Sequence, residues 1–456
     1  MVAERERVFI IGVGCTAFTK PKGQRQTNDM GLEAATKALL DAGITYDAVE
    51  AAFVGYVYGD STCGQAALYQ LGLTGIPITN VNNNCATGSV ALFHAASLVR
   101  AGEARCALAL GFERMAPGKL GENPAWPDRP NPLSPLLEAA LRASPDAKRG
   151  PSMPRIFGAA AAEYFRKYGG NVEHLAKIAA KNHKHSVNNP YAQFRAGYKE
   201  AEVLASAQIS NELTKFMCSP TSDGAACCII ANEAFVHAHK LENQSIELVA
   251  TGLATDYPDA FAGRSAMDTV GYGMTRRLSD KVFAQAGATR DDVGVVELHD
   301  CFAANELVTY PALGLCTIED AHRFVERGDN TYGGKYVVNP SGGLEAKGHP
   351  LGATGLAMHF SITMQLRNWA GAMQAPGLFD LPDPRGKYGL VHNLGLGGAA
   401  VISLLRRPEF YREIGLDGRD RLGYNHAHEL RPITRTDVDK VQAKNNSEGL
   451  LQLAKL

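Results

Sequence analysis

Four residues suited to nucleophilic and acid/base chemistry stand beside predicted structural boundaries in this sequence. Cys85 follows three asparagines and precedes an apolar stretch, and His349 comes just before a second stretch of this kind. His299 and Cys301 directly follow the apolar run 293–298, where we expect a strand to end. A thiol at a helix start is near the positive end of the helix dipole and free N–H groups, which stabilise a thiolate. The positions favour Cys85 as a nucleophile, with His299, Cys301 and His349 as acid/base candidates.

A glycine-rich segment, 393–398 (NLGLGG), ends the last predicted strand of the main body. Glycine lets a backbone approach a ligand closely. Taken one at a time, each His is more often a structural residue and each Cys a small core residue. Together they place a nucleophile, a possible second acid/base and two imidazoles at matching ends of similar segments.

Two short sequence segments recur in the same order in the second half of the chain. Residues 41–49 (DAGITYDAV) are echoed by 285–293 (QAGATRDDV), and the ATG at 86–88 by the ATG at 353–355. Chance recurrence of short phrases is the alternative. A duplication predicts two similar α/β halves around a pseudo-two-fold axis, with the N-termini of the two ATG helices close together.

The elements that must position these residues follow from the apolar patterns. We expect a helix from 31 to a C-terminal Gly43 and strands at 8–14, 51–58, 106–112, 225–231, 293–298 and 389–392. The region between the halves is long, rich in Pro and Ala, and predicted to be mostly helical. The predicted domains are an N-terminal half (1–112 with 212–245), an inserted loop domain (113–211), a C-terminal half (246–407) and a polar tail (408–456).

Composition excludes several classes of protein. With 456 residues, 45% hydrophobic and 20% charged, the chain is neither disordered, collagen-like nor coiled-coil. A formal charge of −1 gives no reason to expect nucleic acid as a partner, and no apolar run is long enough for a membrane span. Nine scattered Cys without a CxxC pair are typical of free thiols in a reducing compartment, and the charged start is not a secretory signal.

Competing motifs fail on their context. The glycines at 12–17 imitate a dinucleotide fingerprint, but 20–23 (KPKG) stands where its helix must begin, and 395–400 leads into a β-rich run. The paired Cys and His residues lack the spacing of a tetrahedral zinc site. There is no GxxxxGK[ST] and no GxSxG. We therefore expect no metal, nucleotide cofactor or flavin.

The chain resembles the thiolase superfamily, and within it the sterol-carrier-protein-type thiolases, from about residue 8 to 405. The resemblance is carried by seven motifs in the family's order: 82–89 (NNNCATGS), 182–191 (NHKHSVNNPY), 220–224 (PTSDG), 299–302 (HDCF), 339–343 (NPSGG), 348–355 (GHPLGATG) and 392–395 (HNLG). It implies a fold of two βαβαβαββ halves in a layered αβαβα core, with a loop domain over the site and a homodimer as the usual unit.

The resemblance also implies roles for individual residues. Cys85 matches the family's acyl-accepting nucleophile and His349 the residue that activates it. Most thiolases carry an acid/base Cys in a C-terminal Cys-x-Gly, where this chain has Asn393, which cannot move a proton. The sterol-carrier-type pattern implies that Cys301 takes over that role. His299 and His349 would form one oxyanion hole, and the N–H groups of Cys85 and Gly395 another.

Coenzyme A would be the co-substrate, with no tightly bound cofactor. The cationic stretch 177–185 then suggests phosphate contacts from Lys181, His183, Lys184 and His185, although mixed charge on a helix is commonly only a solvated face. The ending Ala454-Lys455-Leu456 is a variant of the Ser-Lys-Leu address read by the peroxisomal import receptor, which predicts a peroxisomal rather than cytoplasmic location. The tail is too short for a lipid-carrier domain, so we expect none.

The predicted activity is thiolytic cleavage of long straight-chain or 2-methyl-branched 3-ketoacyl-CoA in peroxisomal β-oxidation, through an acyl-cysteine intermediate. The products would be a shortened acyl-CoA with acetyl-CoA or propionyl-CoA. One alternative is a biosynthetic acyltransferase or Claisen-condensing enzyme using the same Cys85 chemistry. Another is a non-catalytic thiolase homologue that binds acyl-CoA.

Overall fold

The computed structural model describes residues 6–444 except 24, 117–132, 148–149 and 416. Its ten strands form one hydrogen-bonded series in the order β3-β2-β4-β5-β1-β6-β10-β9-β7-β8. Strands of the first half are β1 (Val8–Cys15), β2 (Ala51–Gly55), β3 (Ile78–Val81), β4 (Cys106–Glu113) and β5 (Gly224–Asn232). Strands of the second half are β6 (Ile246–Ala254), β7 (Val293–Glu297), β8 (Val337–Val338), β9 (Tyr388–Gly395) and β10 (Ala399–Arg406).

The strand order confirms the duplication. Numbered within its own half, each set of five strands runs 3-2-4-5-1, and the two sets meet where β1 pairs with β6 through Phe9–Glu247 and Ile10–Ile246. In both halves, strand 2 is parallel to its neighbours 3 and 4, and strand 5 is antiparallel to strands 4 and 1. This is the predicted α/β arrangement of two βαβαβαββ halves.

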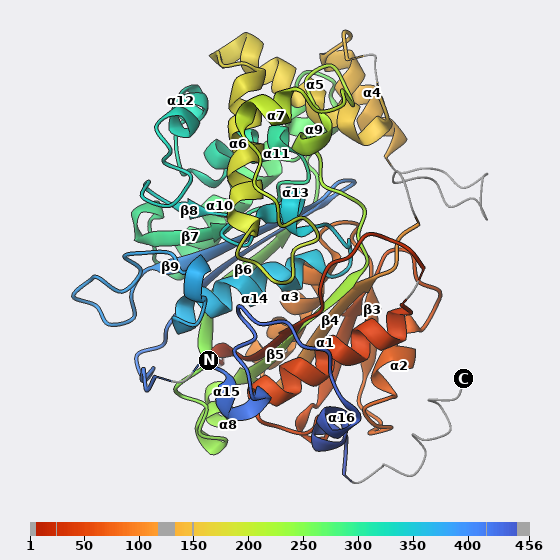
Figure 1. The fold of residues 1–456 in the computed structure, drawn as a ribbon, viewed down its shortest axis with the longest axis vertical. Helices are drawn as coiled ribbons and strands as arrows, with labels where there is room; N and C mark the ends of the chain where they lie inside the picture. The colour runs from red at the N-terminus through yellow and green to blue at the C-terminus, as the bar shows by residue number, and fades with distance from the viewer. Residues whose placement is uncertain (1–5, 24, 117–132, 148–149, 416, 445–456) are drawn as a thin grey trace.

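The helices of the two halves complete five layers, αβαβα. In the first half α1 (Thr27–Ala42) packs on β1 and β5 from outside, with α2 (Cys63–Leu68) beside it, while α3 (Thr87–Arg100) packs on the opposite face. In the second half α10 (Tyr272–Ala286) packs outside β6 and β10 with α11 (Ala303–Leu313) beside it. The middle layer is formed by α3 and α14 (Thr354–Arg367), which contact each other between the five-stranded part of the first half and that of the second (Figure 1).

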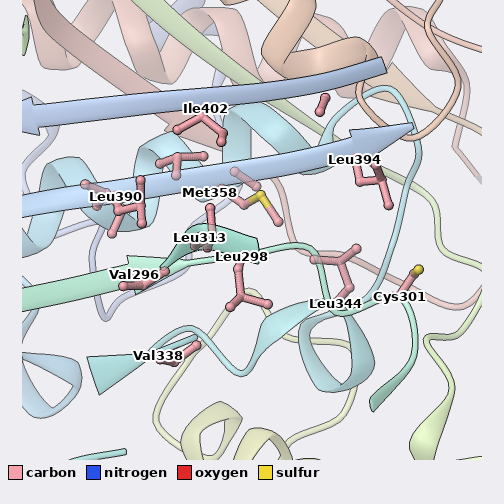
Figure 2. Close-up of a cluster of buried hydrophobic side chains, with 14 of the residues drawn as sticks. Val296, Leu298, Cys301, Leu313, Val338, Leu344, Met358, Leu390, Leu394 and Ile402 are labelled. Carbon is pink, nitrogen blue, oxygen red and sulfur yellow. The ribbon is translucent and has the colours of Figure 1, made fainter. Parts of the chain in front are cut away.

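Alternation along β1 explains why both of its faces are apolar. Phe9 and Ile11 belong to the core under α1, whereas Val8 and Ile10 belong to the larger core shared with the middle layer. Figure 2 shows part of that larger core in the second half, where Val296, Leu390 and Ile402 come from β7, β9 and β10, which are neighbours in the sheet. A strand buried on both faces reads as the continuous apolar run seen in the sequence.

Glycines allow the middle layer to form. A Cβ on Gly355 would stand 2.2 Å from Ser89 Oγ, and one on Gly88 would stand 2.7 Å from the carbonyl oxygen of Gly352. The first turns of α3 and α14 therefore touch backbone to backbone. The predicted closeness of the two ATG helices is confirmed.

Among the described residues between β4 and β5 there are four α-helices: α4 (Ser134–Ala143), α5 (Ser152–Tyr168), α6 (Val172–Ser186) and α7 (Glu200–Leu204). They gather at one end of the molecule with α9 (Ala266–Thr269), α11 and α12 (Ala321–Glu326) (Figure 1). The short helix α13 (Gly343–Lys347) packs against α6. α8 (Glu233–Ala238) follows β5 near the opposite end.

The segment after β10 packs onto the first half as far as it is described. Its helices α15 (Arg419–Leu422) and α16 (Arg435–Val441) contact α1. Arg421 Nη1 donates to the Asp41 carbonyl oxygen at 2.8 Å, and the Ala443 amide donates to the Leu71 carbonyl oxygen at 2.9 Å. Within the described residues, no helix has both the length and the apolar character needed to cross a bilayer.

Most predicted elements lie where the pattern indicated, with shifted ends. The first helix begins at Thr27 rather than 31 and ends, as predicted, at Gly43 in the left-handed conformation. The strand predicted for 51–58 ends at Gly55, because the amides of Val57 and Tyr58 turn away to donate to the Glu113 carboxylate.

Candidate active site

Cys85 lies in the short loop between β3 and α3. Asn84, just before it, has a φ of 52°, a conformation that asparagine tolerates better than most residues. The Asn84 side chain donates to the Leu396 carbonyl oxygen at 2.9 Å, which ties this loop to the loop after β9. Thr87 Oγ1 accepts from the Asn83 amide at 2.8 Å. These contacts hold the thiol at the junction of the two halves.

His349 lies in the equivalent loop before α14, and its hydrogen bonds determine its tautomer. Thr354 Oγ1 donates to the Pro350 carbonyl oxygen at 2.9 Å, so at 2.7 Å it accepts from His349 Nδ1–H. Burial lowers the pKa of His349 to about 3, so the ring is neutral. Its Nε2 therefore carries a lone pair, and this atom has no hydrogen-bond partner among the described residues. This nitrogen has a free lone pair to accept a proton; burial makes the ring a weak base, and a thiolate formed beside it would stabilise the protonated ring.

His299 has the opposite tautomer. Asn393 Nδ2 lies 3.1 Å from the Cys85 carbonyl oxygen and 3.0 Å from His299 Nδ1. Because the carbonyl needs a donor, the amide nitrogen faces both groups, and His299 Nδ1 is the acceptor. Burial, followed by the nearby imidazoles of His349 and His392, lowers the pKa of His299 well below its ordinary value. The neutral ring consequently carries its proton on Nε2, as a hydrogen-bond donor.

These groups converge on one point. The Cys85 Sγ and one ring nitrogen each of His299 and His349 all lie within 4.8 Å of one another. The centroids of the two imidazole rings are 5.1 Å apart at an interplanar angle of 77°. A metal ion would need lone pairs from both rings, whereas His299 presents an N–H. One base and one donor around a thiol fit nucleophilic catalysis better than metal binding.

Burial keeps Cys85 protonated until a base acts on it. Burial, and then the Glu113 carboxylate, raise the pKa of Cys85 to about 12, while its own backbone N–H acts in the opposite direction. The backbone N–H stabilises the thiolate, as expected, but desolvation has the larger effect on the pKa. His349 Nε2 is the unpaired acceptor beside the thiol.

Cys301 lies between β7 and α11 and is 6% exposed. Its carbonyl oxygen accepts from the Ser219 amide at 2.9 Å, and Phe302 forms a bridge with Cys218. Burial raises the pKa of Cys301 well above its ordinary value, and electrostatic interaction with Cys85 raises it further. The Cys301 thiol is therefore held in its protonated form, which the acid role expected for it requires.

Gly395 and Asn393 lie at the end of β9, next to the loop that carries Cys85. A Cβ on Gly395 would stand 2.1 Å from the Asn83 carbonyl oxygen, so only glycine lets β9 approach the Cys85 loop. Asn393 is fully buried and acts through its side chain, by bridging the Cys85 backbone and His299.

The predicted phosphate contacts are wrong for three of the four residues. Lys181 is buried in an ion pair with Glu306, and His183 is buried against Phe216, where burial lowers its pKa to about 4. His185 Nδ1–H donates to the Asn339 carbonyl oxygen at 3.0 Å and Nε2 accepts from Thr331 Oγ1 at 2.9 Å, and burial lowers the pKa of this ring to about 3. Only Lys184 is exposed. The helix α6 uses most of its cationic face to pack against the body.

Two functional residues were missed by sequence reasoning. Thr354 sets the tautomer of His349 from the first turn of α14, and its spacing of five residues was the available signal. Glu113 accepts from the amides of Val57, Tyr58 and Gly352, each at 3.0 Å, and so joins the ends of β2 and β4 to the loop before α14. A carboxylate directly after a buried strand was its only mark in the sequence.

Two family descriptions match this chain. "Thiolase, N-terminal domain" matches residues 8–202, and "Thiolase C-terminal domain-like" matches residues 262–404. The chain belongs to the thiolase family. Its strand order and its site at the junction of the halves agree with that assignment.

Within the thiolase family the chain is similar to the sterol-carrier type. It is 53% identical to sterol carrier protein 2 of Gallus gallus over 402 residues, 88% of this chain and 72% of that protein. It is 44% identical to non-specific lipid-transfer protein-like 2 of Caenorhabditis elegans, over 89% of this chain and 97% of that protein. An acetyl-CoA acetyltransferase of Methanothermobacter thermautotrophicus is 31% identical, over 88% of this chain and 99% of that protein. The chain is thus a thiolase-family acyltransferase.

Solved structures show the same fold at low identity. Human mitochondrial 3-ketoacyl-CoA thiolase has a TM-score of 0.63 and 18% identity, covering 89% of this chain and 99% of that chain. An Ltp2–ChsH2(DUF35) aldolase has a TM-score of 0.69 and 19% identity, covering 91% of this chain and 100% of that chain. These likenesses show the fold alone.

Proposed function

We propose that the protein cleaves 3-ketoacyl-CoA by thiolysis, with Cys85 as the acyl-accepting nucleophile. The observation that carries this proposal is the junction of one thiol, one unpaired imidazole base and one imidazole donor within 4.8 Å. The relative named acetyl-CoA acetyltransferase supports acyl transfer between CoA thioesters.

The first half-reaction begins when His349 Nε2 takes the proton of Cys85. The thiolate attacks the keto carbon of the substrate, and the resulting oxyanion is stabilised by backbone N–H groups at Cys85 and Gly395. Collapse of this intermediate breaks the C–C bond, leaves the acyl group on sulfur and releases the electron pair as a thioester enolate. His299 Nε2–H donates to the enolate oxygen, and protonated His349 supplies a second donor.

Cys301 then gives its proton to the enolate carbon, so that acetyl-CoA, or propionyl-CoA from a 2-methyl-branched substrate, leaves as a neutral product. The Cys301 thiolate takes the thiol proton of incoming coenzyme A. The CoA thiolate attacks the acyl-Cys85 thioester, and Cys85 leaves as a thiolate that regains its proton from His349. Both thiols and both imidazoles return to their starting protonation states. Coenzyme A acts as a co-substrate, and no tightly bound cofactor is needed for any step.

The first alternative is a biosynthetic acyltransferase or Claisen-condensing enzyme. It uses the same Cys85 chemistry, and the site geometry is compatible with either direction. The second alternative, a non-catalytic acyl-CoA-binding homologue, is disfavoured because the part of the chain that the structure describes gives the buried His349 Nε2 no hydrogen-bond partner that would explain it structurally.

The deciding experiment combines the protein with 3-ketoacyl-CoA thioesters of different chain length and branching. With CoA present, we expect a shortened acyl-CoA and acetyl-CoA or propionyl-CoA. Without CoA, intact mass spectrometry should show the acyl group on Cys85, and Cys85→Ala should abolish this adduct. An acyl adduct without shortened product would transfer the assignment to the biosynthetic alternative. No adduct and no product would favour the non-catalytic one.

Location and assembly are further parts of the proposal. Residues 454–456, which carry the Ala-Lys-Leu ending, lie outside the described residues, and we propose that they direct the protein to peroxisomes and their β-oxidation pathway. A fluorescent fusion that keeps this ending should be peroxisomal, and one that lacks it cytoplasmic. We also propose a homodimer, which light scattering at known concentration would test.

A further inference from the structure

Three carboxyl groups and one ammonium group lie together behind Cys301, all of them buried. Asp300 precedes Cys301, Glu306 is on α11, Glu345 is on α13, and the cation is Lys181 on α6. If all three carboxyls were ionised, the cluster would hold two uncompensated negative charges in a dry interior. Such an arrangement is costly, so a buried carboxyl without donors is expected to keep its proton.

Two of the carboxyls have hydrogen-bond donors. Asp300 accepts from the Leu344 amide at 2.7 Å, from the Glu345 amide at 3.3 Å and from Asn182 Nδ2 at 3.0 Å. Glu306 pairs with the ammonium of Lys181 and accepts from Asn182 Nδ2 at 2.7 Å; Tyr310 and Asn339 also donate to it. Burial, and then the Glu306 carboxyl, raise the pKa of Asp300 well above its ordinary value, and its donors oppose that rise. A proton held by this cluster is therefore expected on the carboxyl that lacks donors.

Glu345 has no such donors. Both of its carboxyl oxygens are buried without a hydrogen-bond partner among the described residues, and so is Asn182 Oδ1. The orientation of the Asn182 amide is determined, because its nitrogen donates to two carboxylates. Asn182 is close enough to act on Glu345, and as a donor it would lower the pKa of that carboxyl. Its nitrogen, however, already donates to Asp300 and Glu306, which leaves Oδ1 for Glu345. An O–H on Glu345 that donates to Asn182 Oδ1 would satisfy both groups at once.

We propose that Glu345 is a proton-carrying positioning residue for Cys301: a neutral carboxylic acid that donates to Asn182 Oδ1 and avoids adding a second negative charge, beside that of Asp300, near the acid/base thiol. The part that concerns Cys301 rests on the proposed thiolase function. The hydrogen-bond pattern carries the protonation itself, and burial with the neighbouring Asp300 and Glu306 carboxyls raises the pKa of Glu345 in agreement with it.

The link from Glu345 to Cys301 runs through α13. The amides of Leu344 and Glu345 hold the Asp300 carboxylate, and Cys301 is the next residue; Figure 2 shows Leu344 and Cys301 in the same part of the core. Glu345 also interacts electrostatically with the thiols of Cys301 and Cys218. Cys301 must become a thiolate in each turnover, and an ionised Glu345 would oppose that change. Loss of the Glu345 proton should therefore switch off the acid.

Infrared difference spectroscopy tests the protonation without any turnover. The spectrum of wild type minus Glu345→Gln at neutral pH should contain the carbonyl band of a protonated carboxylic acid, which should shift in deuterated water. A difference spectrum with only carboxylate bands would overturn the proposal. The band is expected whether or not the protein performs thiolysis, so its absence and a failure of the proposed function are distinguishable.

A pair of variants then tests the effect on Cys301, with exchange of the α-protons of acetyl-CoA in deuterated water as the measurement. Glu345→Gln keeps a donor for Asn182 and should exchange near the wild-type rate at neutral pH. Glu345→Leu keeps volume but removes the donor, and should exchange roughly tenfold more slowly. Wild-type exchange should fall with rising pH as the infrared band disappears, and Glu345→Gln should lack that fall. Equal losses in both variants, or a fall that persists in Glu345→Gln, would contradict the link to Cys301.

Discussion

Asn393 Nδ2 lies 3.0 Å from His299 Nδ1 and 3.1 Å from the carbonyl oxygen of Cys85, so a single amide group positions an imidazole and the nucleophile's backbone together. This residue stands where most thiolases have an acid/base cysteine. At this position the side chain controls a tautomer instead of transferring a proton, and the proposed mechanism assigns proton transfer to Cys301.

Replacing Asn393 with Leu should remove the donor that keeps the His299 proton on Nε2. We expect kcat for thiolysis to fall roughly 100-fold, because an oxyanion donor is no longer held in place. Alkylation of Cys85 by iodoacetamide should change little, because His349 is untouched. An unchanged kcat, or an equal loss in alkylation, would contradict this role.

Thr354→Val and Thr354→Ser form a matched pair. Valine has nearly the same shape but cannot accept from His349 Nδ1–H, so the base is no longer held with its lone pair on Nε2. Alkylation of Cys85 and thiolysis should slow by roughly tenfold to 100-fold in Thr354→Val. Thr354→Ser keeps the hydroxyl and should stay near wild type; a similar loss in both variants would indicate a packing effect instead.

Cys301→Ala should separate acylation from enolate protonation. Because Cys85 and His349 remain, acylation from an activated thioester should persist, while exchange of α-protons should fall to background. Cys218→Ala is the control, since Cys218 is a neighbouring thiol that interacts with the same Glu345 but is not assigned the proton transfer. Exchange that survives in Cys301→Ala would disprove the acid/base assignment.

Glu113 should make folding stability depend on pH. Burial raises the pKa of its carboxyl from 4.5 to about 7, so between these values the folded state binds a proton that the unfolded state releases. Its contribution is present in full below pH 4.5 and is lost as the pH rises to about 7, a change of about 3 kcal/mol. Urea unfolding of wild type and Glu113→Gln across this range should show that decline only in wild type. Parallel curves would contradict it.

Lys181 and Lys184 should behave in opposite ways. Lys181→Met leaves the buried Glu306 carboxylate without its cation, which should cost about 3–5 kcal/mol of unfolding free energy. Lys184→Ala should leave stability unchanged, because that side chain is exposed. Of the two, only Lys184→Ala is expected to weaken CoA binding in calorimetric titration, and the reverse outcome would restore Lys181 as a phosphate contact.

The parts of the fold that were predictable are those encoded locally. Apolar runs marked β1, β4 and β5, and the repeated ATG segments marked the starts of two helices that do pack together. The position of Cys85 beside His349 followed from that repeat. Features of this kind can be predicted because they depend on neighbouring residues in the sequence and not on distant contacts.

The remainder depends on contacts between distant segments. Lys181 and His185 look like a phosphate-binding stretch because the sequence does not tell which face of α6 is buried. The tautomers of His299 and His349 depend on Asn393 and Thr354, which reach them only after folding. The buried carboxyls near Cys301 are equally invisible, because Glu345 reads as an ordinary polar position in a short helix.

The contact between Gly88 and Gly355 has a consequence for how activity is distributed over the chain. The nucleophile belongs to one half and its base to the other, and the close contact of the two glycine backbones in the middle layer helps to hold them in register. Neither half alone contains both the nucleophile and its base, so catalysis requires the two halves to be correctly packed together. Two fragments divided between β5 and β6 should each be inactive. Recovery of turnover when they are mixed would show that the interface between the halves had reassembled correctly.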